Sequence, residues 1–196
     1  MPILMTAVLS LAIAWRRGAP PTGLANVRLR WLALPLVAFV IQMVTFVRLE
    51  SALSAVAPWL HLLSLTLLAA FLAANARYRG LLVVGVGLLL NATVIGLNGG
   101  YMPVRLADIE RAGFYAVAAT LREEGHFQKS TVLDERTRLP WLADVIPVPL
   151  PNGPDRLISI GDVFIAAGAF YFVQEALVGE KRRNALRMAP GAVATA

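Results

Sequence analysis

The sequence of 196 residues contains no cysteine and few charged residues. The absence of cysteine excludes disulfides, thiolate metal ligands and a cysteine nucleophile. Only 15% of the residues are charged and 58% are hydrophobic, whereas a soluble domain usually carries about 25% charged residues. A soluble fold would lack the polar side chains needed to cover its surface, so the composition predicts a protein with a lipid-facing surface.

The net charge of +6 does not indicate a nucleic-acid-binding protein. The basic residues stand in short runs between uncharged stretches, as the positive-inside rule for membrane proteins describes. The sequence also has no phosphate-binding loop, nucleophile elbow or dinucleotide-binding motif. We therefore expect membrane lipid or partner membrane subunits as binding partners, and no nucleic acid.

Five segments with few or no charged residues approach the length of about 20 residues that crosses a bilayer as a helix. They lie near residues 2–15, 31–47, 52–76, 80–97 and 157–178. The first is short, and its arginines follow the apolar run, so we interpret it as an uncleaved anchor and not as a signal peptide. The expected fold is all-α, a polytopic membrane helix bundle forming one domain over residues 1–187, with a flexible tail at 188–196.

The arginines predict the orientation of this bundle. Residues 16–30 and 77–79 carry arginines and no acid, and basic residues also outnumber acids after residue 178. These three regions share one side if the helices alternate in direction, and the positive-inside rule makes that side cytoplasmic. We expect a protein of the bacterial plasma membrane with its N-terminus outside, its C-terminus in the cytoplasm and residues 98–156 outside.

The outer segment, residues 98–156, is predicted to form an ordered cap. Apolar residues recur at helical spacing through 104–124, which indicates an amphipathic helix lying on the membrane surface or on the bundle. Residues 139–154 contain five prolines and no helical period, so we expect extended backbone there.

Polar residues of the predicted spans concentrate in their outer halves. His61 lies in the outer half of the third span, and Asn91 and Asn98 lie in that of the fourth. Asn91 and Asn98 are two helical turns apart and share a face. Such groups are costly in a membrane and usually face a bundle interior. This distribution predicts a polar pocket open to the outside, although bonds between helices would explain the same residues.

Two short motifs border this predicted pocket. Asn98, Gly99 and Gly100 end the fourth span, where they form either a helix cap and turn or a backbone nest facing a ligand. Ser159 and Asp162 open the last span. Asp162 is either the partner of Ser159 in a capping box or an acid at the membrane edge that points into the pocket.

Asp144 and the two histidines remain as candidates for chemistry. Asp144 stands between apolar residues and is either buried, with a raised pKa, or a solvated turn residue. If it approaches Asp162, the two carboxyl groups form a pair for general acid/base hydrolysis. His61 is either a hydrogen-bonded structural residue or a haem or chlorophyll ligand. With His126 and scattered acids it makes a weak case for a metal site, and the sequence names no cofactor.

Four stretches carry a resemblance to a known family: NGGYMPV at 98–104, the region 126–131, LADVIP at 142–147 and SIGDVFIAAG at 159–168. Together they resemble a bacterial family of short multi-pass membrane proteins, known only as a domain of unknown function. The resemblance implies a plasma-membrane protein and brings no activity. A weaker resemblance to lipoprotein signal peptidases implies catalytic roles for Asp144 and Asp162, although the Asn-containing contexts of those enzymes are missing.

The sequence favours a non-enzymatic function, the binding of a lipid, small ligand or partner subunit in the outward-facing pocket. Asn91, Asn98, His61, Asp144 and Asp162 would line that pocket. The alternatives are an aspartate-dependent membrane hydrolase acting on a lipid or lipopeptide, and a structural subunit of a larger membrane complex.

Overall fold

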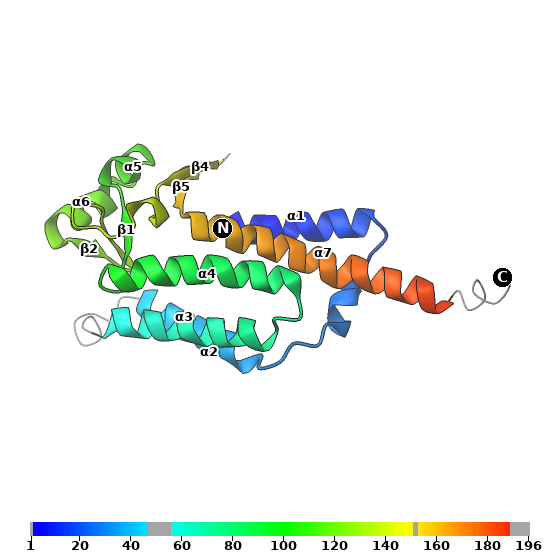
Figure 1. Ribbon diagram of the computed structural model, residues 1–196. Coiled ribbons are helices and arrows are strands. Elements are labelled where there is room, and N and C mark those ends of the chain that lie inside the picture. Colours follow the sequence, from blue (N-terminus) through cyan, green and yellow to red (C-terminus); the bar gives the residue numbers. More distant parts are fainter. Residues whose placement is uncertain (1, 47–55, 151–152, 189–196) are drawn as a thin grey trace.

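The computed structural model describes residues 2–46, 56–150 and 153–188. Five helices run along a common direction, with a smaller mixed region at one end of them (Figure 1). The helices are α1 (Pro2–Arg16), α2 (Ala33–Phe46), α3 (Ala57–Ala74), α4 (Arg79–Leu97) and α7 (Ile160–Met188). A 3-10 turn, η1 (Pro21–Asn26), lies between α1 and α2. Each predicted span therefore contains one helix.

Three of the five helices are long and apolar enough to cross a membrane: α3, α4 and the part of α7 from Ile160 to Gly179. The apolar parts of α1 and α2 are shorter, at Met5–Arg16 and Ala33–Val44. The prediction of a membrane protein is thus supported by three candidate spans, while the full crossing of all five segments stays a prediction, as does the single domain at 1–187. The tail from residue 189 onward lies outside the described residues.

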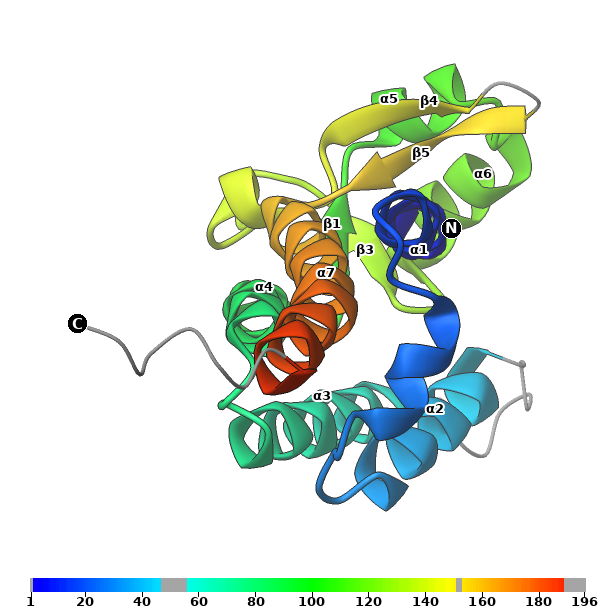
Figure 2. The same cartoon turned by 90° about the vertical axis from the view of Figure 1, so that its right-hand side faces the viewer.

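The helices pack in the spatial order α1, α7, α4, α3, α2. Viewed along the bundle, α1, α7 and α4 lie on one side and α2 and α3 on the other (Figure 2). The two ends of this row, α1 and α2, share hardly any contacts within the described residues. A space therefore lies between the two layers, and α1 and α2 border it on the side where the layers are not packed together.

Glycines bring α4 and α7 into backbone contact. A Cβ atom on Gly87 would lie 2.4 Å from the carbonyl oxygen of Gly161, and one on Gly168 would lie 2.5 Å from the amide nitrogen of Val84. Gly80 meets the backbone of Phe172 in the same way. Small residues allow this approach between membrane helices.

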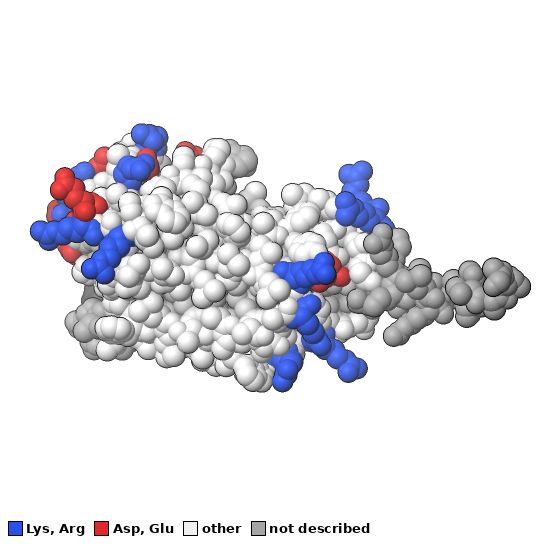
Figure 3. Space-filling model, viewed as in Figure 1, with Lys and Arg blue, Asp and Glu red and all other residues white. Residues whose placement is uncertain are grey.

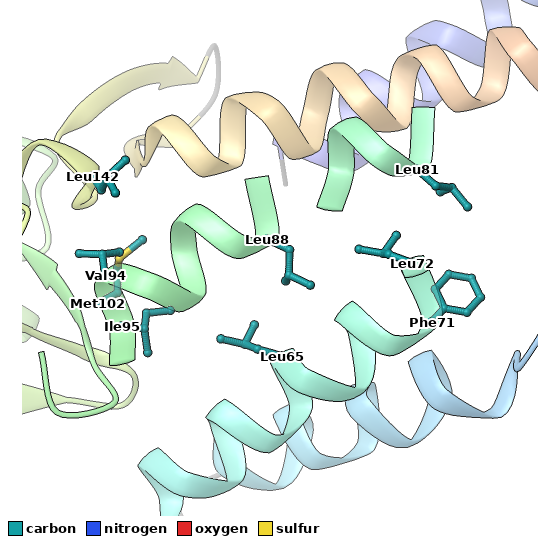
Figure 4. Close-up of a cluster of buried hydrophobic side chains, with 9 residues drawn as sticks. All are labelled: Leu65, Phe71, Leu72, Leu81, Leu88, Val94, Ile95, Met102 and Leu142. Atoms are coloured by element: carbon teal, nitrogen blue, oxygen red, sulfur yellow. The ribbon is translucent and has the colours of Figure 1, made fainter. Parts of the chain in front are cut away.

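An apolar core fills the contact between α3 and α4. Leu65 and Leu72 of α3 point toward Leu88 and Leu81 of α4 (Figure 4). At the cap end of α4, Val94 packs with residues of the cap in the same cluster. The core thus extends from the bundle into the cap and fixes one relative to the other.

Charged side chains gather at the two ends of the molecule. On the face shown in Figure 3 the surface between those ends carries none. Along the helices, large apolar side chains such as Leu36, Phe39 and Leu89 are exposed, each more than half accessible. An uncharged, apolar belt between two charged ends is the surface expected of a chain that crosses a bilayer.

Polar contacts hold the helices together at the end away from the cap. The side chain of Asn75, at the end of α3, exchanges hydrogen bonds with the backbone of Arg30 at 2.8 and 2.9 Å. The carboxylate of Glu175 on α7 accepts bonds from the backbone amides of Arg79 and Gly80. Glu175 thereby caps α4 and complements the positive end of its dipole.

The region between α4 and α7, residues 98–159, is called the cap below. Its strands form a three-stranded sheet in the order β1-β3-β2, with β1 and β3 parallel, and a separate antiparallel hairpin of β4 and β5. Its elements are β1 (Met102–Val104), α5 (Leu106–Arg111), α6 (Tyr115–Glu124), β2 (His126–Phe127), β3 (Ser130–Val132), η2 (Pro140–Leu142), β4 (Ile146–Leu150) and β5 (Gly153–Ile158).

The cap corrects two expectations and confirms a third, the extended backbone of the proline-rich stretch, in β4 and β5. The two small sheets show that the fold is mostly helical and not all-α. The helix predicted through 104–124 is broken into α5 and α6 near Gly113, whose φ of +84° ends the first helix. The proline-rich stretch pairs as a hairpin, because Pro147 and Pro149 lie in a two-stranded sheet whose outer edge needs no amide donor.

Candidate functional site

A cavity of about 620 Å³ lies between the two helix layers and the cap. Its body is apolar and includes side chains of α3, α4 and α7, among them the leucines that face one another in Figure 4. At one end its wall becomes polar. The polar lining residues are Gln42, His61, Asn91, Lys129, Asp144 and Asp162. The cavity thus combines an apolar body with a polar end, within the usual size range of ligand pockets, about 300–1,000 Å³.

Asp162 belongs to a closed hydrogen-bond network with Asn91 and Ser159. Its Oδ1 accepts a bond from Asn91 Nδ2 at 2.9 Å, and its Oδ2 accepts one from the backbone amide of Ser159 at 3.1 Å. Ser159 Oγ accepts from the amide of Asp162 at 3.0 Å and donates to Asn91 Oδ1 at 2.8 Å. Ser159 and Asp162 therefore form a reciprocal capping box, and Asn91 joins it to α4.

Asp144 differs from Asp162 because its side chain accepts no hydrogen bond from the residues that the structure describes. The backbone holds it at the edge of β1, where its amide donates to the carbonyl oxygen of Pro103 at 3.1 Å. The side chain is half-buried, and its Oδ1 is shielded from solvent with no hydrogen-bond partner among the described residues. An unsatisfied buried polar atom is rare and requires an explanation, and the carboxyl group that carries it belongs to a residue lining the cavity.

The pKa of the Asp144 carboxyl reflects this environment. Burial, followed by the charge of Asp162, raises it to about 7, and the ammonium of Lys129 lowers it in part. Asp144 is thus within electrostatic range of both residues, as the sequence-based pairing with Asp162 requires. A carboxyl group with this pKa exchanges its proton near neutral pH.

A smaller pocket of about 80 Å³ adjoins the polar end. It is lined by Pro58, His61, Gly100, Tyr101 and Lys129, together with Gln42, Met43, Ala57 and Gln128. His61 is buried, and no hydrogen bond to its ring occurs within the described residues. Gln42 donates a bond to Ser64 Oγ at 3.2 Å. His61, Gln42 and Lys129 border both spaces.

Sequence reasoning missed Lys129. No local pattern marks this residue, because its position depends on the pairing of β1 with β3. That pairing includes a bond from the amide of Met102 to the carbonyl oxygen of Lys129, 2.8 Å long. Lys129 consequently stands beside the end of α4, although about thirty residues separate the two in the chain.

Other predicted residues lie apart from the cavity. Asn98 donates to the carbonyl oxygens of Val94 and Arg138 and accepts from the amide of Arg138, so it fastens the cap to α4. Gly99 has open space around it, and Gly100 packs against Pro58. Both glycines have positive φ, at +73° and +90°, which fits the turn interpretation. The cavity therefore gathers His61, Asn91, Asp144 and Asp162 but not Asn98, Gly99 or Ser159.

A metal site is not suggested by the arrangement of acids and histidines. No group of three or more His, Asp or Glu side chains comes together among the residues that the structure describes. The most buried acid of the cap, Asp108, is paired with Arg105 and Arg111 at 2.9 and 3.1 Å. That cluster is satisfied internally and has no part in the cavity.

Comparison with known proteins identifies relatives but no activity. A model described as "Family of unknown function (DUF5317)" matches residues 26–174. An uncharacterized protein of Thermotoga maritima is 32% identical over 118 residues, which cover 59% of this chain and 64% of the relative. The match thus spans less than two thirds of the length of that relative. No solved structure matches the chain. The expected relationship to an uncharacterised family is confirmed.

Proposed function

This chain belongs to the DUF5317 family, whose function is unknown, and we propose that it is an integral membrane protein that binds a lipid in the cavity between its helices. The observation that carries the proposal is the shape of that cavity, an apolar body about 620 Å³ in volume with a polar end. A lipid has the same division into apolar chain and polar head. Water-soluble ligands would leave the apolar body without a partner.

The border of the cavity favours entry from the bilayer. Ala7 of α1 and Pro35 of α2 line it, and these two helices share hardly any contacts. Both helices expose large apolar side chains, including Val8 and Leu36, each more than half accessible. A lipid chain could therefore pass between α1 and α2 without crossing a polar surface.

The polar end lies next to the cap, and we propose that this end faces the outside of the cell. Arg16, Arg17, Arg77 and Arg79 stand at the opposite end of the helices, where α1 and α3 end and α4 begins. The positive-inside rule assigns that end to the cytoplasm. The lipid head would then lie at the level of the outer leaflet of the plasma membrane.

Filling the cavity is expected to displace the lipid. Ala169 of α7 lines the apolar body, so the substitution Ala169→Phe places a ring where the acyl chain would lie. We expect at least a tenfold loss of lipid that stays bound through gentle detergent purification, measured by mass spectrometry of the extracted lipids. Ala167→Phe, two residues away on the exposed surface of the same helix, is the matched control.

Equal lipid retention by the two variants would contradict the proposal, since it would show that the lipid coats only the outer surface. A membrane protein that purifies with the chain in fixed ratio, in place of lipid, would favour the third expectation, a subunit of a larger complex.

A second candidate function is hydrolysis of a lipid or lipopeptide by Asp144 and Asp162. One observation favours it: the two acids border one cavity, and the charge of Asp162 contributes to the raised pKa of Asp144. Acid/base pairs are characterised by environments that separate their pKa values. Against this, both oxygens of Asp162 already accept hydrogen bonds, which suits a structural role.

Separate substitutions test this candidate. If hydrolysis occurs, Asp144→Asn and Asp162→Asn each reduce release of product from a membrane lipid extract by at least about a hundredfold, because each removes a general acid or base. Product formation is followed by mass spectrometry, with membrane abundance of each variant as the control. Full activity in Asp144→Asn would rule out the pair.

A further inference from the structure

The polar end of the cavity contains groups of opposite charge that do not pair with each other. Asp144 has a shielded oxygen that no donor of the described residues reaches. Lys129 forms no salt bridge within the described part of the chain, although both residues line the same cavity. The ammonium group is nevertheless near enough to influence the titration of Asp144. The two groups are therefore neighbours separated by more than the length of an ion pair.

A group placed between them would be bound by both. The acceptor at Asp144 calls for a donor, and a charged donor is preferred because charge-assisted bonds are the stronger ones. The donor at Lys129 calls for an anion. The desolvation cost of an unpaired polar atom applies to Asp144, whose Oδ1 is shielded. The Lys129 side chain is exposed, and it adds a charge-assisted contact to an anionic group that lies near it.

We propose that the site binds a lipid whose head group carries both a primary amine and a phosphate. The amine donates to Asp144, and the phosphate lies toward Lys129 at the mouth of the smaller pocket. The proposal rests on the lipid-binding function and specifies the chemical class of the head group.

The smaller pocket suits a phosphate. Lys129 supplies a positive charge there, and His61 and Gln42 supply further polar groups. Among the described residues no acid lines this pocket, whereas Asp144 and Asp162 line only the larger cavity. Lys129 borders both spaces, so its positive charge stands where they adjoin and the two acids stand on the side of the larger cavity, a separation of charge that matches a zwitterionic head group.

The charge division also predicts which head groups bind weakly. A choline head group has no N–H to donate, so it cannot form a hydrogen bond to the carboxyl group of Asp144. A glycerol head group offers only hydroxyl donors and no positive charge to meet the carboxylate. We therefore expect phosphatidylethanolamine to bind at least about tenfold more tightly than phosphatidylcholine or phosphatidylglycerol with the same acyl chains.

The experiment uses the delipidated full-length protein in detergent, with each of these three lipids titrated separately. Binding is measured by native mass spectrometry at pH 8, and soluble phosphoethanolamine is added as a competitor in a further series. Competition by the soluble compound at similar concentration would show that the acyl chains contribute nothing and would overturn the assignment to a lipid. Weak or no competition supports it.

Substitutions assign the two charges. Asp144→Asn is expected to remove the preference for phosphatidylethanolamine over phosphatidylcholine. Lys129→Gln is expected to weaken the binding of all three lipids about tenfold, because each carries a phosphate. Glu123→Gln and Arg136→Gln, on exposed cap residues outside the cavity, are the matched controls. Both controls are expected to keep the binding of the unmodified protein.

The pH dependence provides a further test of the contact with Asp144. Asp144, Asp162, Lys129 and His61 are the titratable groups that face the polar end. Since the pKa of Asp144 is about 7 in the empty protein, binding of the amine is expected to strengthen as pH rises from 6 to 8. This strengthening is expected to be absent in Asp144→Asn.

The outcomes separate this inference from the lipid-binding proposal. Equal binding of the three lipids, still reduced by Ala169→Phe, would overturn the head-group assignment and leave the lipid cavity in place. Preference for phosphatidylglycerol would replace the amine with a purely anionic head group. Lipid binding that Ala169→Phe leaves unchanged, with no head-group preference, would show an adventitious lipid only and remove both.

Discussion

Gly161→Ala is expected to destabilise the protein by about 2 to 4 kcal/mol, because it forces apart the two helices that hold the site. The new Cβ atom would lie 2.0 Å from Asn91 Oδ1 and 2.7 Å from the carbonyl oxygen of Gly87. The second atom belongs to the backbone and cannot turn away. Moving Asn91 instead breaks its bonds to Ser159 and Asp162, so either response has a cost.

The measurement is the temperature or denaturant dependence of unfolding of the purified protein in detergent. Gly96→Ala is the control on α4, since a Cβ there would meet only Leu62, at 4.0 Å. We expect that substitution to be neutral or slightly stabilising, because alanine favours helix over glycine by up to about 1 kcal/mol. If Gly161→Ala were as stable as Gly96→Ala, the close approach of α4 and α7 would be wrong.

Asp144→Asn is expected to abolish a pH dependence of stability that can reach about 4 kcal/mol. The folded pKa is about 7 against an ordinary value of 3.8. Below pH 4 the carboxyl is protonated in both states and has no effect. As pH rises from 4 to 7 the unfolded chain ionises first, so the folded state loses relative stability, and the full loss is reached above pH 7.

The asparagine variant carries no such charge, so its stability is expected to vary less between pH 5 and pH 8 than that of the unmodified protein. At pH 8 it is expected to be the more stable of the two in the absence of ligand. Unfolding in detergent at a series of pH values measures this, with Glu123→Gln as the control on an exposed acid of the cap. Parallel pH curves for the unmodified protein and Asp144→Asn would contradict the burial of Asp144.

The motif at the start of α7 could be predicted in part from the sequence. Gly161 and its neighbours lie in a local motif, and the capping box of Ser159 and Asp162 is formed as the three-residue spacing predicts. Asn91 completes that motif from α4, which spacing alone could not reveal. Sequence reasoning thus found the acid at the start of α7 but left its structural and functional interpretations open.

The cap shows where local patterns were insufficient. Apolar spacing through 104–124 predicted a single helix. Gly113 instead takes a positive φ and divides that helix, which apolar spacing alone does not indicate. Asp108 is buried between two arginines, a contact that the apolar spacing does not reveal. The prolines of β4 indicated extended backbone correctly, but their pairing with β5 is a property of the folded chain.

The sequence by itself determined that the chain has five apolar helices and charged ends. Uncharged runs near the length of a bilayer can be recognised without knowledge of their neighbours, because the cost of charge in hydrocarbon is local. The tertiary structure decided which polar residues meet. Asp144 and Lys129 reach the end of α4 through pairing with β1, between segments up to about forty residues apart, and such pairing depends on the whole fold.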